Sequence, residues 1–345
     1  ANVEELCEQA ISCFLEIWQH VGKYNVEVQR VWGRYPKPTE SLYKANKQFI
    51  VASLQGLREP LTNKDKDVVS AISATTLLVV DECHIAVAPT YTRIVEDINF
   101  ASGCRIIGLT ATPGRTLEEE TAELSNLFFG EIVSLQDPNG EIDNAIEYLR
   151  AIKVLSDVTY DQLIVDPGVS LSKKEYLKLQ TELDFSPTIL NKLGRSSVRT
   201  VEIIARLTPL LNEGAQVLLF APSIENSKFI TSLFTFLGYK AAHIDGTTQT
   251  KSRQYLISQY IRSNIQILCN YGVLATGFDA PKTDVLCIAR PTKSPVLYSQ
   301  MIGRGLRGPA VGGTEKCLVV EVKDNFLHQG TQKELYTHFS DYWLN

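Results

Sequence analysis

The chain has 345 residues, which is enough for two domains of ordinary size. Its 44% hydrophobic and 21% charged residues are typical of a soluble globular protein, and its net charge of −5 argues against nucleic-acid binding by charge alone. No apolar run approaches the ~20 residues of a membrane span, and no charged-then-apolar signal segment opens the printed sequence, so we expect a cytoplasmic protein with no membrane partner.

The first 150 residues alternate between helical and strand-like patterns. Residues 2–18 repeat apolar side chains at spacings of three and four, which predicts an amphipathic helix. Three short apolar runs follow, and each stops at polar or small residues, as buried strands of a parallel sheet do: 48–54, 77–80 and 105–109. We therefore expect a first α/β domain over residues 1–150.

The middle of the chain is more acidic and less periodic. Residues 117–195 contain helical patches but no strong strand pattern. We interpret this stretch as the end of the first domain followed by a connecting region over 151–195. A solvated linker explains it most simply, and a partner-binding surface there stays open.

Regular alternation returns in residues 196–345, which we predict to be the second domain. Helices are predicted over 198–213, 225–237 and 250–262, and the first two stop at glycines. Strands are predicted for "QVLLFA", "AAHID", "IQILCN", "VLCIA" and "CLVVEV". Alternation of this kind implies right-handed crossovers. We therefore expect an α/β protein with two domains, each a parallel sheet flanked by helices.

The cysteines do not indicate a metal site. Seven are present, and no two of them form a C-x-x-C pair. Several lie inside apolar runs such as "ILCN", which favours buried free thiols in a reducing compartment.

The stretch "TLLVVDECHIA" runs from a buried strand into Asp81, Glu82, a cysteine and His84. In an open parallel sheet, ligands bind outside the carboxyl ends of the strands. Of two adjacent carboxylates there, one can hold a hydrated Mg²⁺ ion while the other orients or deprotonates a water molecule. The pair suits metal-assisted hydrolysis of a phosphoanhydride; an exposed turn with two solvated acids is the alternative.

Two further motifs follow strands. "GLTATPGR" ends a strand in Thr110 and Thr112, whose hydroxyl groups are able to hydrogen-bond to the acidic pair and relay its state. An ordinary turn after a strand explains the same residues. "LATGFDAP" places Gly277 and Asp279 in a loop between a strand and a helix.

The stretch "SQMIGRGLRG" places Gln300, Arg304 and Arg307 at spacings of four and three. On a continuous helix these side chains share one face. Guanidinium groups bind phosphate oxygens bidentately, so two arginines and a glutamine suit a triphosphate. A basic helix face without a ligand is the alternative.

The order of these motifs resembles that of the superfamily 2 DExH-box helicases and translocases. "DECH", "TAT", "GFDAP" and the pattern Q-x-x-G-R-x-x-R occur in this order across two strand–helix blocks. The resemblance covers nearly the whole chain and is greatest to the bacterial group related to the Res subunits of type III restriction enzymes and to XPB-like helicases. It implies two RecA-like domains that bind ATP and Mg²⁺ between them and grip a nucleic-acid strand.

The resemblance implies a role for each residue of the first-domain motifs. Asp81 would coordinate Mg²⁺ through water, and Glu82 would be the catalytic base. His84 would sense the state of the nucleotide. Thr110 and Thr112 would couple hydrolysis to domain movement.

It also implies roles for the second-domain motifs. Gly277 and Asp279 would lie near the ribose and the γ-phosphate of the nucleotide. Gln300, Arg304 and Arg307 would complete the site, with the two arginines acting on the γ-phosphate.

Nucleic-acid contacts are implied for the loops "ASLQGL" and "APSIEN". Their candidate residues are Ser53, Gln55 and Ser223, which would position a strand without reading its sequence. The family resemblance favours DNA over RNA as the partner. A partner subunit in a restriction or phage-defence complex is compatible with it, because related proteins often work in such complexes.

One family motif does not occur in the printed sequence. The family holds ATP with a phosphate-binding loop, G-x-x-x-x-G-K-[ST], upstream of the other motifs. The pair Gly22-Lys23 does not fit, because Tyr24 follows it and Ile17 stands at the first glycine position. We interpret the chain as a fragment and expect the polypeptide as printed to bind ATP poorly and not to turn it over.

The sequence thus supports an ATP-dependent helicase or translocase as the leading hypothesis. A helicase-like scaffold that has lost hydrolysis and binds nucleic acid or a partner protein is the alternative. A small-molecule α/β enzyme would leave the paired arginines and the second strand–helix block unexplained.

Overall fold

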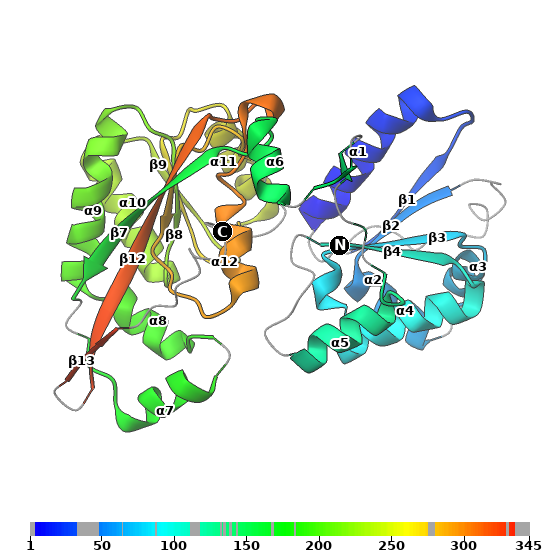
Figure 1. Ribbon diagram of the computed structural model, residues 1–345, viewed down its shortest axis with the longest axis horizontal. Coiled ribbons are helices and arrows are strands. Elements are labelled where there is room, and N and C mark those ends of the chain that lie inside the picture. The colour runs from blue at the N-terminus through cyan, green and yellow to red at the C-terminus, as the bar shows by residue number, and fades with distance from the viewer. Residues whose placement is uncertain are drawn as a thin grey trace. The chain divides into compact units, whose positions relative to one another are not determined.

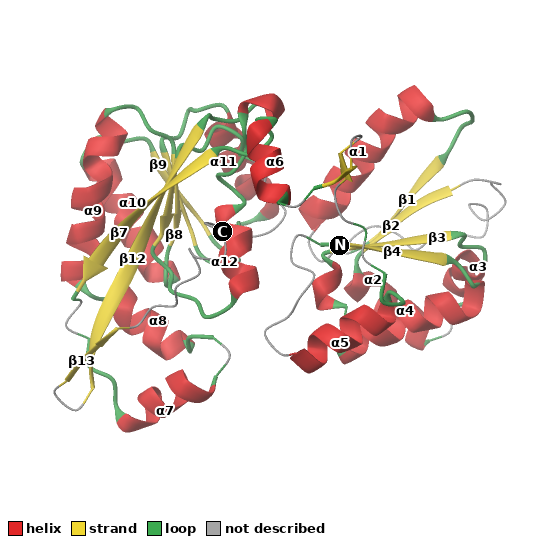
Figure 2. Ribbon diagram, in the orientation of Figure 1, coloured by secondary structure: helices red, strands yellow, loops and turns green. Residues whose placement is uncertain are grey.

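The computed structural model describes residues 4–32, 48–63, 65–86, 88–110, 118–131, 133, 136–137, 140–142, 144–166, 169–182, 184–274, 280–328 and 331–334. The chain forms two compact units, residues 1–133 and 134–345. Figure 1 traces each unit by residue number, and Figure 2 shows its helices and strands. The division at 133/134 lies before the predicted end of the first domain at residue 150.

The described elements of the first unit begin with a long helix. In chain order they are α1 (Glu4–Val21), β1 (Glu27–Val31), β2 (Gln48–Ala52), α2 (Leu54–Thr62), α3 (Lys66–Ser73), β3 (Leu77–Asp81), the 3₁₀ turn η2 (Cys83–Ile85), α4 (Pro89–Ser102), β4 (Arg105–Leu109) and α5 (Glu118–Leu127). The predicted first helix is therefore α1, and the three predicted strands are β2, β3 and β4.

The strands of the first unit pair in parallel, as predicted. β1 pairs with β2, and β3 pairs with β4 so that Asp81 lies opposite Leu109. Helix α1 packs on the first pair through Cys7 and Ile11. Helices α2, α3 and α4 pack together and cover the side of β3–β4 that carries Leu78 and Ile106.

Most of the described strands belong to the second unit. In chain order its described elements are β5 (Gln136–Asp137), β6 (Gly140–Glu141), α6 (Ala145–Ala151), β7 (Asp157–Val165), α7 (Lys173–Thr181), α8 (Pro187–Gly194), α9 (Ser197–Asn212), β8 (Val217–Phe220), α10 (Ile224–Phe236), β9 (Ala241–Ile244), α11 (Thr250–Ile261), β10 (Ile267–Asn270), β11 (Val285–Ile288), α12 (Pro295–Ile302), the 3₁₀ turn η3 (Pro309–Val311), β12 (Lys316–His328) and β13 (Thr331–Glu334).

The large sheet of the second unit has the strand order β7–β12–β11–β8–β10–β9, and all of these pairs are parallel. β13 adds an antiparallel hairpin to the end of β12. Helices cover both faces of the sheet, as Figure 2 shows. One face of β8 packs against α9 and α10 through Val217 and Leu219, and the other packs against α11 and α12 through Leu218 and Phe220. This unit confirms the prediction of a parallel sheet flanked by helices.

Glycines end two of the predicted helices. Gly214 follows α9 with a φ of 90°, and Gly238 follows α10 with a φ of 91°. Only glycine adopts this left-handed conformation without a steric penalty from a Cβ atom.

One expectation for the middle of the chain is wrong. Residues 117–195 were expected to contain no strand ladder, yet β7 lies in this range and pairs with β12 over nine residues. Helices α7 and α8 follow it and bury a small core of their own that includes Phe185, Ile189 and Leu193. β7 escaped prediction because its exposed and half-buried residues, unlike those of β8, form no continuous apolar run.

The helices that the structure describes do not meet the requirements of a membrane span. Among the described residues, no helix combines the length and the apolar character that crossing a bilayer requires.

Candidate active site

The acidic pair lies where the sequence predicted it, at the carboxyl end of β3. Asp81 is the last residue of the strand and is exposed. Its Oδ1 atom accepts a hydrogen bond of 3.0 Å from the backbone N–H of Glu82. Glu82 has a φ of 51° and a ψ of 46°, in the left-handed region that costs a non-glycine residue energy. The chain thereby turns sharply into η2 and leaves both carboxylates at the edge of the sheet.

His84 joins the two strand ends of the first unit. Its Nδ1 atom lies 3.3 Å from Glu82 Oε2 and 3.2 Å from Thr110 Oγ1. The imidazole side chain is 6% exposed and that of Glu82 is 27% exposed. Because a carboxylate only accepts hydrogen bonds, the tautomer with a proton on Nδ1 satisfies Glu82 and also faces the threonine oxygen.

Thr110 contacts the histidine that follows the acidic pair. A threonine hydroxyl was expected to bond to the acidic pair. The hydroxyl of Thr110 meets His84, which in turn contacts Glu82. The imidazole therefore connects the end of the "TAT" strand to one of the acids. Leu109 faces Asp81 across the ladder, which brings the residues that follow the two strands to one edge.

Close packing beneath the turn holds it in place. A Cβ atom added to Gly108 on β4 would lie 2.8 Å from Cys83 Sγ and 2.7 Å from the ring of Phe128. Cys83 is buried, and burial raises the pKa of its thiol. This cysteine therefore acts as a packing residue between the two sequence-predicted functional side chains.

The acidic pair fits the way proteins hold Mg²⁺ next to a nucleotide. Such an ion usually takes one or two carboxylates and completes its shell with water and phosphate oxygens. Asp81 offers one exposed carboxylate of this kind. No cluster of three or more His, Cys, Asp or Glu side chains suited to a metal occurs in the described ranges, so a dedicated all-protein cage is not what these residues form.

In the second unit, the prediction that Gln300, Arg304 and Arg307 share one helical face is wrong. Helix α12 ends at Ile302, and the chain then turns through Gly303. The three side chains therefore do not share one helical face. Arg304 Nε donates to the carbonyl of Gln300 at 3.2 Å, whereas Arg307 lies in an antiparallel bridge opposite Leu155.

Packing explains why the helix stops. A Cβ atom on Gly305 would lie 2.7 Å from Cys317 Sγ and from Leu286, both on the sheet below. Glycine at this position lets the backbone touch the sheet, and a further helical turn would carry it away. All three predicted side chains remain partly exposed.

The two serines predicted to contact nucleic acid play the same structural role. Ser53 follows β2 and accepts a hydrogen bond of 2.9 Å from the N–H of Gly56. Ser223 follows β8 and accepts one of 3.1 Å from the N–H of Asn226. Both are buried N-caps, so their hydroxyl oxygens are engaged within the chain. Gln55 is exposed in the first turn of α2.

Three predicted site residues, Thr112, Gly277 and Asp279, lie outside the described residues. Their roles stay predictions.

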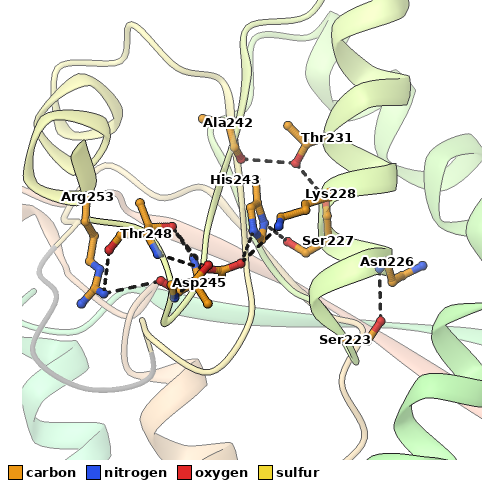
Figure 3. A network of polar contacts seen from close by, with 11 residues as sticks. Ser223, Asn226, Ser227, Lys228, Thr231, Ala242, His243, Asp245, Thr248 and Arg253 are labelled. Atoms are coloured by element: carbon orange, nitrogen blue, oxygen red, sulfur yellow. Dashed lines mark hydrogen bonds and ion pairs between the residues drawn. The ribbon is translucent and has the colours of Figure 1, made fainter. Parts of the chain in front are cut away.

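The second unit also contains a polar network that sequence reasoning did not select (Figure 3). Ser227 Oγ lies 2.7 Å from His243 Nδ1, and His243 Nε2 lies 3.0 Å from Asp245 Oδ2. Asp245 Oδ1 accepts from the backbone N–H groups of Thr247 and Thr248 at 2.7 and 3.0 Å. The sequence signal was the mostly polar stretch "HIDGTT" at a strand end.

This Ser–His–Asp arrangement stabilises a turn. Ser227 and Asp245 are 0% and 1% exposed, so a substrate has no path to the hydroxyl group. Burial by itself would raise the pKa of Asp245, but hydrogen bonds from Thr247 and His243 together hold it below its ordinary value. The ionised carboxylate shapes the loop that leads from β9 to α11.

Comparisons with known proteins agree with this architecture. Residues 1–115 match the family "Type III restriction enzyme, res subunit", and residues 199–308 match "Helicase conserved C-terminal domain". The chain is 28% identical over 244 residues to a 51.5 kDa protein of Lactococcus phage (isolate 7-9), covering 71% of this chain and 49% of that protein. It is 30% identical over 254 residues to a Schizosaccharomyces pombe protein named as a mitochondrial ATP-dependent helicase, irc3, covering 72% and 38%.

Solved structures share the fold at low sequence identity. The helicase MrfA bound to DNA and AMPPNP has a TM-score of 0.61 at 16% identity, over 93% of this chain and 40% of that one. Dbp5 of S. cerevisiae bound to RNA and ADP BeF3 has a TM-score of 0.55 at 14% identity, over 99% of this chain and 72% of that one.

The fold and the two matched domains define a helicase-like α/β protein of the RecA-like class. Within that class, the chain belongs to the superfamily 2 helicases of the Res-subunit type. It spans about half or less of the length of these two curated relatives.

Proposed function

We propose that the protein is an ATP-driven helicase or translocase that acts on DNA. The observation that carries this proposal is the contact of His84 with both Glu82 and Thr110 at the carboxyl edge of β3 and β4. It joins a candidate base to the end of the neighbouring strand, which a pair of solvated acids in an exposed turn would not require.

Each residue of this edge has a chemical role in the proposal. Glu82, partly exposed, orients and deprotonates the attacking water. Asp81 would hold a hydrated Mg²⁺, which, when bound, neutralises charge on the phosphate oxygens. His84 contacts both Glu82 and Thr110, so a change in the charge or position of Glu82 is transmitted through the imidazole to Thr110. Arg304 and Arg307 of the second unit supply positive charge to the transferred phosphate.

DNA is proposed on the relationship to the Res-subunit type. MrfA, a structural neighbour, was solved with DNA, whereas Dbp5 was solved with RNA, so both nucleic acids belong in the test. A setting in restriction or phage defence, with a partner subunit, is proposed on the match of residues 1–115 to the res subunit of type III restriction enzymes.

The test is an ATPase assay on the full-length product of the gene, since the G-x-x-x-x-G-K-[ST] loop does not occur within the 345 printed residues. Turnover is measured without nucleic acid and with single-stranded DNA, double-stranded DNA and RNA. We expect stimulation by DNA, and Glu82→Gln should lower kcat by roughly 10²- to 10⁴-fold, the usual contribution of a general base. Glu96→Gln, on the exposed surface of α4, is the matched control and should retain activity.

Other outcomes discriminate between the hypotheses. Stimulation by RNA alone would replace DNA with RNA as the substrate. A folded protein without turnover on any nucleic acid would contradict the proposal and favour a scaffold that binds nucleic acid or a partner protein.

A further inference from the structure

The segment that carries Arg307 is held by a second segment, far away in the sequence. We name residues 303–314 the arginine segment and residues 153–156 the clamp segment. The N–H of Gly308 donates to the carbonyl of Val154 at 2.9 Å, and the N–H of Ser156 donates to the carbonyl of Leu306 at 3.1 Å. Two hydrogen bonds therefore flank Arg307 on either side of its bridge with Leu155.

Ser156 makes the most specific contact between the two segments. Its side chain is fully buried, and its Oγ atom lies 2.8 Å from the carbonyl oxygen of Arg307 and 2.8 Å from that of Thr314. The single hydroxyl proton is shared between two carbonyl acceptors. One side chain thereby holds both ends of the loop that starts at Arg307.

Two glycines permit close backbone approaches at this place. A Cβ atom on Gly308 would lie 2.2 Å from the carbonyl oxygen of Lys153, and one on Gly313 would lie 1.8 Å from that of Arg307. Real Cβ atoms do not come this close to backbone oxygens. Glycine at position 308 therefore lets the arginine segment meet the clamp segment, and glycine at position 313 lets the loop that starts at Arg307 close on itself.

The clamp segment is itself anchored to the large sheet. Ser156 directly precedes β7, which pairs with β12 over nine residues. The N–H of Asp157 donates to the carbonyl of Glu315 at 2.9 Å, at the start of that ladder. The position of the Arg307 backbone is therefore fixed by hydrogen bonds to residues beside the large sheet. It is not set by helix α12, which ends five residues earlier.

From these contacts we infer that Ser156 is a positioning residue for Arg307: its buried hydroxyl fixes the backbone from which the guanidinium reaches the transferred phosphate. The inference rests on the proposed function. Charge stabilisation by an arginine depends on its placement, and a displacement of about 1 Å can lower a rate by roughly 100-fold. A serine that merely fills space would alter stability and leave kcat unchanged.

The first measurement tests the clamp without reference to activity. Hydrogen exchange is followed by peptide mapping in the full-length protein and in Ser156→Ala. The variant leaves two buried carbonyl groups without their hydroxyl donor, so peptides covering 304–314 should exchange about tenfold faster. Peptides of β8 and β10 report whether the fold persists. Unchanged exchange over 304–314 would overturn the clamp.

The second measurement tests the assigned role. In nucleic-acid-stimulated ATP hydrolysis, Ser156→Ala should lower kcat by about tenfold or more while the KM for ATP stays within about twofold, the pattern of an interaction made in the transition state. Gly308→Ala, which pushes the same two segments apart, should show the same split. Ser186→Ala is the matched control, because Ser186 is also buried in this unit and its Oγ has no hydrogen-bond partner among the described residues.

The outcomes separate the two proposals. Faster exchange with an unchanged kcat would overturn the positioning role of Ser156 and leave the proposed function intact. A loss of kcat in Ser186→Ala equal to that in Ser156→Ala would assign the effect to general destabilisation and overturn the role as well. A wild-type protein without any turnover would remove the proposed function, and the role of Ser156 with it.

Discussion

The two units differ in how completely helices cover their parallel strands. In the second unit, β8, β10 and β11 are buried along their whole length, with helices on both faces. In the first unit, β3 and β4 alternate: Leu78 and Ile106 face the helices, whereas Val79 and Ile107 are 48% and 46% exposed. Among the described residues, one face of this strand pair carries an apolar surface that helices do not cover.

This difference separates the unit that carries the proposed catalytic acids from the unit that carries the proposed phosphate-binding arginines. Parallel sheets normally have both faces covered, and the second unit meets this rule while it holds the arginines on a backbone tied to the sheet. The acids lie on strands that have only one packed face. We therefore expect the second unit to dominate stability, and the first unit to tolerate changes on the open side of its strands.

The largest effect is expected from the buried ion pair of the second unit. Arg199 Nε lies 2.6 Å from Asp324 Oδ1 with both side chains fully buried, and the guanidinium also donates to the carbonyl of Ala289. Arg199→Met leaves a buried carboxylate without its partner, which typically costs about 3–5 kcal/mol. Urea unfolding followed by far-UV circular dichroism measures this loss.

A second mutation controls for the lost charge. Burial raises the pKa of Asp324, and Arg199 opposes that rise. Asp324→Asn added to Arg199→Met should therefore restore part of the stability, because it removes the unpaired charge. A double variant that is less stable than Arg199→Met would contradict this account of the pair.

The next prediction compares two apolar strand residues directly. Leu219 on β8 is fully buried and Val79 on β3 is about half exposed. Leu219→Ala should cost about 2–5 kcal/mol, and Val79→Ala less than about 1 kcal/mol, because only the first leaves a cavity between packed layers.

The tryptophans make the measurement selective for one unit. The chain contains three, Trp18, Trp32 and Trp343, so in a Trp343→Phe background the remaining two both lie in the first unit. Leu219→Ala should lower the midpoint of the unfolding transition followed by circular dichroism more than the midpoint followed by tryptophan fluorescence. Equal shifts of both midpoints would show that the two units unfold together, which would contradict the expected difference in their stability.

The smallest effect concerns the helices α7 and α8 beside the large sheet. Lys192 Nζ lies 2.7 Å from Glu175 Oε1, and this bond, together with the capping contacts of Ser172, lowers the pKa of Glu175 from 4.5 to about 2. A carboxylate with a lowered folded-state pKa contributes stability that is present above pH 4.5 and is lost as the pH falls toward 2. Glu175→Gln should lose that contribution, about 1 kcal/mol or less.

The pH profile supplies the control. The stability difference between the wild type and Glu175→Gln should be full near pH 6 and should vanish near pH 2. Glu202→Gln, at an exposed position of α9, should show no such profile. A difference that is independent of pH would mean that packing, not charge, explains the effect of Glu175.

Sequence reasoning identified most strands but only part of the site geometry. β8, β10 and β11 were predictable because their apolar runs are continuous, as strands buried on two faces require. β7 was missed because half-buried residues interrupt its pattern. The spacing of Gln300 and Arg304 predicted a helical face, but Gly303 and Gly305 let the chain leave the helix before Arg307.

By itself, the sequence determined most of the elements that form and which chemical groups stand at their ends. Apolar runs specify strands, glycines stop α9 and α10, and Asp81 and Glu82 follow a strand, because these are local properties of the chain. Only the tertiary structure decided which distant groups meet. His84 contacts Thr110, Arg199 pairs with Asp324, and Ser156 bonds to Arg307 across 151 residues. The ladders of the sheets bring these partners together, and no periodicity along the chain records such pairs.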